Sequence, residues 1–136
     1  MQNDDFRRGR HCAFMMHVHL VFVTKYRRAR FTCDHLQLLE KIFAGVCRDF
    51  NAELVEMNGE RDHVHLLVNY PPNVSVSKLV NSLKGVSSRM LRKQWQEAFE
   101  RSFGACLWSP SYFAASCGGA PLSVIRQYIE NQESPN

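Results

Sequence analysis

Two copies of the tetrapeptide His-Val-His-Leu stand in the chain: the first pair is His17 and His19, and the second pair is His63 and His65. Alternate residues of a β-strand project from the same face, about 6.5–7 Å apart along the strand. Two imidazoles at this spacing can bind one metal ion through metal–nitrogen bonds of about 2.1 Å. Each pair is therefore a candidate metal site, although such pairs are often no more than two partly exposed histidines.

The residues around each pair favour the second one, but only mildly. Glu60 and Asp62 precede the second pair, and a carboxylate can orient a metal-binding imidazole by accepting a hydrogen bond from its other ring nitrogen. The first pair is followed by basic side chains, which favour a phosphate over a metal cation. These basic residues are Lys25, Arg27 and Arg28.

The side chains between the histidines predict the face of the sheet that each pair occupies. Around the second pair, Val64, Leu66 and Val68 alternate with the histidines and have the apolar character of a core-facing set. We therefore expect the second pair to point away from the helices. Around the first pair both alternating sets are apolar, so its face is not predicted.

Apolar periodicity and turn residues predict the elements that must position these side chains. Strands are expected at residues 17–24, 52–58, 62–70 and 108–116. A helix capped by Asp34 should follow the first strand, and one capped by Ser75 or Ser77 should follow the third. With a last helix within residues 121–133, the order is β-α-β-β-α-β-α. This order is typical of the split β-α-β or ferredoxin-like plan, an α+β fold with an antiparallel sheet and two helices on one face.

The helix after Ser75 or Ser77 carries two distinct sets of residues. Its buried stripe is predicted to comprise Leu79, Leu83, Val86 and Met90, and its outer side Asn81, Lys84, Ser88 and Arg92. Residues 95–107 are predicted to hold a short helix and a loop. Three aromatic side chains beyond it, Trp108, Tyr112 and Phe113, could stack on unpaired bases, but core or dimer packing is favoured.

Composition limits the classes of protein to consider. The chain has 136 residues, enough for one compact domain over 1–136, of which we expect 1–12 to be flexible. Its five cysteines include no Cys-x-x-Cys pair, which favours buried reduced thiols over disulfides or a zinc site. Neither a signal peptide nor an apolar run long enough to span a bilayer is evident, so a cytoplasmic protein without a membrane partner is expected.

Basic residues are unevenly distributed, although the formal net charge is only +4. One group lies within residues 7–30, and a second lies in the helix after Ser75 or Ser77. Clustered basic charge attracts phosphates even when the net charge is small. The candidate nucleic-acid contacts are Lys25, Arg27, Arg28, Lys84, Ser88, Arg89 and Arg92.

Four stretches of the sequence carry a resemblance to a known family: HLVFVTKYRR, RDHVHLLV, SVSKLVNSLKGVSSRMLR and LWSPSYFAASCGGAPLSVIRQYIENQ. In this order and spacing, over most of residues 20–132, the chain resembles the single-tyrosine transposases of the insertion-sequence 200/605 group. These belong to the HUH endonucleases, named for His-hydrophobe-His. The resemblance implies a ferredoxin-like domain and a homodimer whose active sites are shared between subunits.

The resemblance also implies roles for individual residues. His63 and His65 correspond to the metal-binding pair, Gln132 to a third ligand of Mg²⁺ or Mn²⁺, and Tyr128 to the nucleophile. The position of His19 also matches a histidine of the family, but we assign His17 and His19 to structure or substrate contact. Tyr128 and Gln132 are four residues apart, and so lie on one face of a helix. Gly118 and Gly119, which could simply end a strand, are hypothesised to be a hinge for that helix.

The activity that the resemblance implies is cleavage and rejoining of single-stranded DNA at hairpin-bearing element ends, through a covalent 5′-phosphotyrosine. Two alternatives remain. One is a related HUH endonuclease acting on repeated extragenic palindromes, which would use the same chemistry. The other is a non-catalytic nucleic-acid-binding module, whose sheet face should carry stacking aromatic residues where this sequence has histidines.

Overall fold

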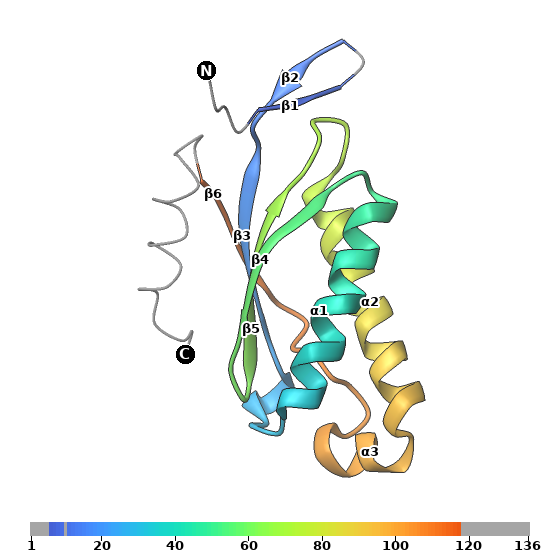
Figure 1. Cartoon of the computed structure of the whole chain (residues 1–136). Coiled ribbons are helices and arrows are strands. Elements are labelled where there is room, and N and C mark those ends of the chain that lie inside the picture. The colour runs from blue at the N-terminus through green and yellow to red at the C-terminus, as the bar shows by residue number, and fades with distance from the viewer. Residues whose placement is uncertain (1–5, 10, 118–136) are drawn as a thin grey trace.

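A four-stranded antiparallel sheet forms the centre of the fold, with strand order β4-β5-β3-β6. The computed structural model describes residues 6–9 and 11–117 of the chain. The sheet comprises β3 (His17–Val23), β4 (Glu53–Gly59), β5 (His63–Asn69) and β6 (Phe113–Ser116). A short pair of strands, β1 (Arg7–Arg8) and β2 (Ala13–Phe14), extends beyond one end of it (Figure 1).

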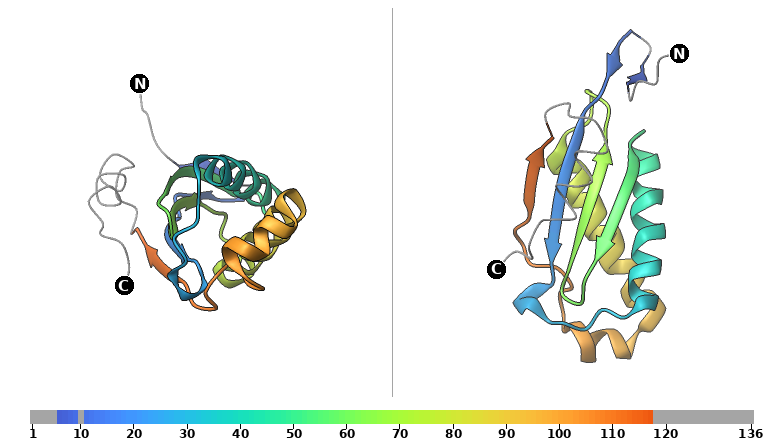
Figure 2. Two further views of the ribbon diagram at one scale, coloured as in Figure 1. Left: turned by 90° about the horizontal axis from the view of Figure 1, so that it is seen from below. Right: turned by 60° about the vertical axis from the view of Figure 1, so that its left-hand side comes forward.

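Helices α1 (Cys33–Asp49) and α2 (Val76–Trp95) cover one face of the sheet, and α3 (Glu97–Phe103) lies across its lower end in Figure 1. Figure 2 shows the four strands side by side with both long helices behind them. A 3-10 turn, η1 (Lys25–Arg27), follows β3. The predicted α+β class and antiparallel sheet are confirmed. Among the described helices, none is both long enough and apolar enough to cross a bilayer.

The N-cap of helix α1 lies two residues before the predicted one. Asp34 was expected to cap it, but the N-cap is Thr32. The Thr32 hydroxyl accepts from the His35 backbone N–H at 3.3 Å, and His35 Nδ1 accepts from the Thr32 N–H at 3.0 Å. This reciprocal capping box satisfies two backbone donors at once, whereas a single carboxylate cap satisfies one. His35, for which the sequence indicated no role, is therefore structural.

The last strand is shorter than expected. Only Phe113–Ser116 pairs with β3, and Trp108 forms an isolated bridge with Thr24. Pro110 lies between these points and has no N–H to donate to a strand ladder. The carbonyl oxygens of Ser109 and Ser111 instead accept hydrogen bonds from Lys84 Nζ, at 2.6 and 3.3 Å.

The hydrophobic core fills the space between the sheet and the two long helices. Val64, Leu66 and Val68 of β5 belong to it, as predicted. The predicted stripe of α2 is wrong in part, because Met90 is 45% exposed and Val86 is only partly buried. The buried residues of α2 are Leu79, Val80, Leu83, Ser87 and Leu91. Hydrophobicity favours Val86 and Met90 over a serine, so the apolar pattern of the helix does not predict that Ser87 is buried.

A hydrogen-bonded pair explains why a serine occupies the core. Trp108 Nε1 donates to Ser87 Oγ at 2.9 Å, and Ser87 Oγ donates to the Lys84 carbonyl at 3.0 Å. Trp108 is buried against Phe22 and Phe31, as its predicted packing role requires. The indole N–H would otherwise be buried without an acceptor, which is costly.

Replacing Ser87 by alanine should therefore destabilise the fold. The expected loss is about 1–3 kcal/mol of unfolding free energy, because the Trp108 N–H then lacks its partner. Urea unfolding followed by tryptophan fluorescence measures it. The matched control is Ser88→Ala on the same helix, which should change stability by no more than about 0.5 kcal/mol. Equal stability of the two variants would contradict this role of Ser87.

Candidate metal centre

Both histidine pairs project from the same face of the sheet. In the antiparallel pairing of β3 with β5, Val21 lies opposite His65 and Val23 lies opposite His63. Residues directly opposite one another share a face, and alternate residues of one strand share it too. The first pair, at positions 17 and 19, therefore lies on the face of the second pair. This face is opposite to the one covered by α1 and α2, which confirms the prediction for the second pair.

A carboxylate orients the first histidine of the second pair. Asp62 Oδ1 lies 2.8 Å from His63 Nδ1, and Asp62 Oδ2 lies 3.2 Å from Arg27 Nη2. Partial burial opposes ionisation of Asp62, but the hydrogen bond with His63 and the charge of Arg27 hold the pKa of this carboxyl below its usual range. An ionised Asp62 accepts the proton on Nδ1, which leaves the lone pair of His63 on Nε2. Glu60, the other carboxylate considered, is exposed.

The second histidine of the pair is buried and neutral. His65 is 6% exposed, and its ring centroid lies 5.0 Å from that of His63 with the two planes at 80°. Burial, together with the smaller effects of the charges of His63 and His19, lowers the pKa of His65 to about 4. A metal ligand must be an unprotonated imidazole, so this environment keeps His65 in the binding form at neutral pH.

One residue of the first pair contacts the second. His19 Nε2 lies 3.0 Å from His65 Nδ1, and the two rings are stacked with centroids 5.2 Å apart. Burial also lowers the pKa of His19. His17 has a different neighbour, since Asn69 Nδ2 lies 3.3 Å from His17 Nε2. The sequence did not indicate the contact between His19 and His65, because it depends on the pairing of two strands far apart in the chain.

The described part of the chain supplies two suitable ligands for a divalent ion, but not a third. Two imidazoles with adjacent rings, one held by a carboxylate, are typical ligands of such an ion. Within the residues that the structure describes, no group of three or more histidine, cysteine or acidic side chains could hold a metal. A third protein ligand would therefore be of another type or lie elsewhere. The candidates Gln132, Tyr128, Gly118 and Gly119 lie outside the described residues.

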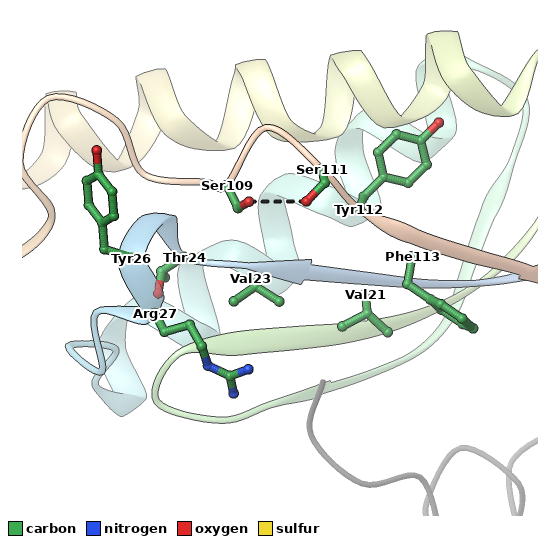
Figure 3. A pocket seen from close by; sticks show the side chains of 9 residues that line it. All are labelled: Val21, Val23, Thr24, Tyr26, Arg27, Ser109, Ser111, Tyr112 and Phe113. Atoms are coloured by element: carbon green, nitrogen blue, oxygen red, sulfur yellow. Dashed lines mark hydrogen bonds between the residues drawn. The ribbon is translucent and has the colours of Figure 1, made fainter. Parts of the chain in front are cut away.

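A cavity of about 370 Å³ is lined by residues of β3, of the turn after it and of the segment that leads into β6 (Figure 3). Val21 and Val23, which face the second pair across the strand register, line it. Tyr112 and Phe113 also line it and are 40% and 44% exposed, so neither belongs to the core. The remaining lining residues are Thr24, Tyr26, Arg27, Ser109 and Ser111. The cavity thus combines aromatic and hydroxyl groups with Arg27, the cation that pairs with Asp62.

Several of the basic residues selected from sequence already bind protein groups. Lys84 donates to two carbonyl oxygens of the loop before β6, and burial lowers its pKa. Arg28 donates to the carbonyl oxygen of Phe103. Arg92 donates to the carbonyl oxygen of Ala105 at 2.7 Å. These three cations help to hold the segment from α3 to β6, whatever further contacts they make.

The other candidate nucleic-acid contacts have different surroundings. Arg27 pairs with Asp62, and Lys25 lies over the Tyr26 ring with its Nζ 5.4 Å from the centroid. Tyr26 has φ 60°, a left-handed conformation uncommon for a non-glycine residue, and is 76% exposed. Arg89 is exposed on α2, and Ser88 beside it is half-buried.

Comparisons with known sequences concern nearly the whole chain. The family described as "Transposase IS200 like" matches residues 12–132. The chain is 28% identical over 128 residues to the ISDra2 transposase TnpA of Deinococcus radiodurans, covering 94% of this chain and 91% of that protein. It is 32% identical over 114 residues to the transposase for insertion sequence element IS200 of Salmonella typhimurium, covering 84% and 74%.

Two solved structures are similar to the fold. A crystal structure of a transposase from Deinococcus radiodurans has a TM-score of 0.75 and 29% identity, and the match covers 95% of this chain and 99% of that one. A REP-associated tyrosine transposase bound to a REP hairpin has a TM-score of 0.59 and 15% identity, with 94% and 69% covered. The second likeness, at its low identity, shows the fold alone.

The contact between Asp62 and His63 gives a test of the candidate metal centre. Asp62→Ala should weaken Mn²⁺ binding by about 10- to 100-fold, because His63 loses the group that fixes its tautomer and ring orientation. Electron paramagnetic resonance of free Mn²⁺ measures the affinity. Glu60→Ala is the matched control, because it removes a nearby exposed carboxylate, and it should leave the affinity unchanged. Equal affinities of the two variants would contradict the role of Asp62.

Proposed function

Because the chain belongs to the IS200-like transposase family, as the sequence resemblance predicted, we propose that it cleaves and rejoins single-stranded DNA at hairpin-bearing element ends. The family implies strand cleavage and joining. The hairpin ends and a covalent 5′-phosphotyrosine are our more specific proposal. The observation that carries it is the pair His63 and His65, whose rings are adjacent in space, with His63 oriented by Asp62 and His65 kept unprotonated by burial.

Two residues of β5 would hold the metal, with Gln132 as the proposed third ligand. An ion held there, Mg²⁺ or Mn²⁺, would supply Lewis-acid polarisation of the oxygens of a phosphodiester. Asp62 keeps the Nε2 lone pair of His63 available, and burial keeps His65 unprotonated. Imidazole and amide donors are neutral, so they do not cancel the positive charge that this chemistry needs.

Tyr128 is the proposed nucleophile. Its phenolic oxygen would attack phosphorus and lose its proton, while the bond from phosphorus to the 3′ oxygen breaks and that oxygen leaves as a 3′-hydroxyl. The phosphotyrosine retains the energy of the phosphodiester. A 3′-hydroxyl of another strand can then attack phosphorus and release the tyrosine, which rejoins DNA without ATP.

The arrangement of the rest of the chain completes the proposal. We propose one HUH domain of ferredoxin-like plan over residues 1–136, with the tyrosine on a C-terminal helix at 121–133. In a homodimer this helix would complete the site of the partner subunit. We propose Gly118 and Gly119 as a hinge that would let this helix swing between subunits during strand exchange. A cytoplasmic location follows from the substrate and from the bacterial relatives.

The proposal of a hairpin substrate draws on a protein of similar fold, since a REP-associated tyrosine transposase has been solved bound to a REP hairpin. The same observation keeps a second candidate open, a related HUH endonuclease acting on repeated extragenic palindromes. Both would use one chemistry. The DNA around the gene separates them, because a mobile element has hairpins near its own ends and a domesticated enzyme acts on palindromes dispersed elsewhere.

The nucleophile is tested by trapping the covalent intermediate. The full-length protein incubated with a hairpin-bearing single strand and Mg²⁺ should give a protein–DNA adduct that survives a denaturing gel. Tyr128→Phe should remove the adduct completely, because phenylalanine has no hydroxyl to attack phosphorus. Tyr26→Phe is the matched control and should retain it. An adduct that persists in Tyr128→Phe would show that another residue is the nucleophile.

Substitution of the proposed metal ligands should abolish DNA cleavage without abolishing hairpin binding. His63→Ala and His65→Ala should each abolish cleavage but leave hairpin affinity within about threefold of wild type, because phosphate contacts supply most of the affinity. Hairpin binding by gel shift and cleavage on the same samples measure both. A wild-type protein that binds hairpins but never cleaves them would instead support the non-catalytic binding module.

The exposed face of α2 is proposed to contact the DNA backbone. Arg89 is the best residue for a test, because Lys84 and Arg92 also hold the loop before β6. Arg89→Ala should weaken hairpin binding and reduce the slope of log affinity against log salt by about 1, as expected for one lost phosphate contact. Lys41→Ala is the control, because Lys41 is an exposed basic residue on α1. An unchanged salt slope in Arg89→Ala would exclude this contact.

A further inference from the structure

The hydrogen bond between His19 and His65 constrains the proton on His65. The two nitrogens are 3.0 Å apart, and both side chains are buried, at 0% and 6% exposure. A hydrogen bond between two imidazole nitrogens needs an N–H on one ring and a lone pair on the other. Only one proton can lie between the two nitrogens, and one ring must therefore donate while the other accepts.

The direction of this hydrogen bond decides whether His65 can bind a metal. When His65 donates from Nδ1, its lone pair is on Nε2 and that nitrogen can be a ligand. When His65 accepts at Nδ1, its proton is on Nε2 and that nitrogen cannot bind a cation. We propose that His19 is a positioning residue, which accepts the Nδ1 proton of His65 at its own Nε2 and so fixes Nε2 of His65 as the metal ligand. This inference rests on the proposed function.

The surroundings of His19 suit this role. Its ring is stacked on His65, with 19° between the planes, and Phe113 packs edge-on against it at 5.6 Å. These contacts limit rotation of the acceptor. The two metal-binding histidines would thus have different partners: a partly exposed carboxylate for His63, and a buried imidazole for His65. A carboxylate at position 19 would be a buried charge, which is costly.

The test compares an acceptor-retaining and an acceptor-removing variant of the full-length protein. The oxygen of glutamine can reach the place of Nε2, so His19→Gln should bind Mn²⁺ within about threefold of wild type, whereas His19→Leu should bind it about tenfold more weakly or worse. His17→Leu is the matched control from the same strand and should retain wild-type affinity. Thermal unfolding confirms that each variant is folded. Equal Mn²⁺ affinities of His19→Leu and wild type would overturn the proposal, and so would equal losses in His19→Leu and His19→Gln.

A second measurement needs no variant and no metal. Nitrogen-15 NMR of the imidazole side chains in wild-type protein reports which ring nitrogen of His65 carries the proton. We expect the proton on Nδ1, and a proton on Nε2 would overturn the proposal. Failure of the proposed function is recognised separately. If wild-type protein binds no Mn²⁺, the proposed metal site is wrong. The NMR measurement of the His65 tautomer then still tests whether His19 accepts the Nδ1 proton of His65.

Discussion

The antiparallel pairing of β3 with β5 is the interaction on which the site depends. It places Val21 opposite His65, and so makes His19 the diagonal neighbour of His65 on one face. Diagonal neighbours are about 7–8 Å apart at their backbones, within reach of two imidazole rings. A shift of β3 by one residue against β5 would turn His17 and His19 toward the helices and bring Val18 and Leu20 to the opposite face. The core residues between the histidines hold this register.

Burial and neutrality are linked at this face. Histidines that lose contact with water lose their protons, so the surroundings that exclude solvent also keep the imidazoles in the form that binds a cation. Asp62, directly before β5, differs from these histidines because it remains charged. Its carboxylate pairs with both His63 and Arg27. One charge therefore orients a candidate ligand and connects it to the basic turn that follows β3.

Sequence reasoning succeeded where a local pattern determines the structure. The strand carrying the second pair and the outward direction of its histidines follow from alternation alone. It failed where a polar residue has a distant partner, since Ser87 is buried only because Trp108 needs an acceptor. The contact of His19 with His65 could not be predicted for the same reason. Alternation of side chains predicts the two faces of one strand, but not the register in which that strand pairs with another. The predicted roles of Tyr128 and Gln132 stay predictions.

The central claim is that the two histidine pairs form one unit, in which the second pair binds the ion and His19 only orients a ligand. A crystal structure of the full-length protein with Mn²⁺, with data collected for anomalous scattering by manganese, tests this most directly. The account predicts one anomalous peak at bonding distance from Nε2 of both His63 and His65, with His19 Nε2 still hydrogen-bonded to His65 Nδ1. A peak bonded to His19, or one that does not involve His65, would contradict it.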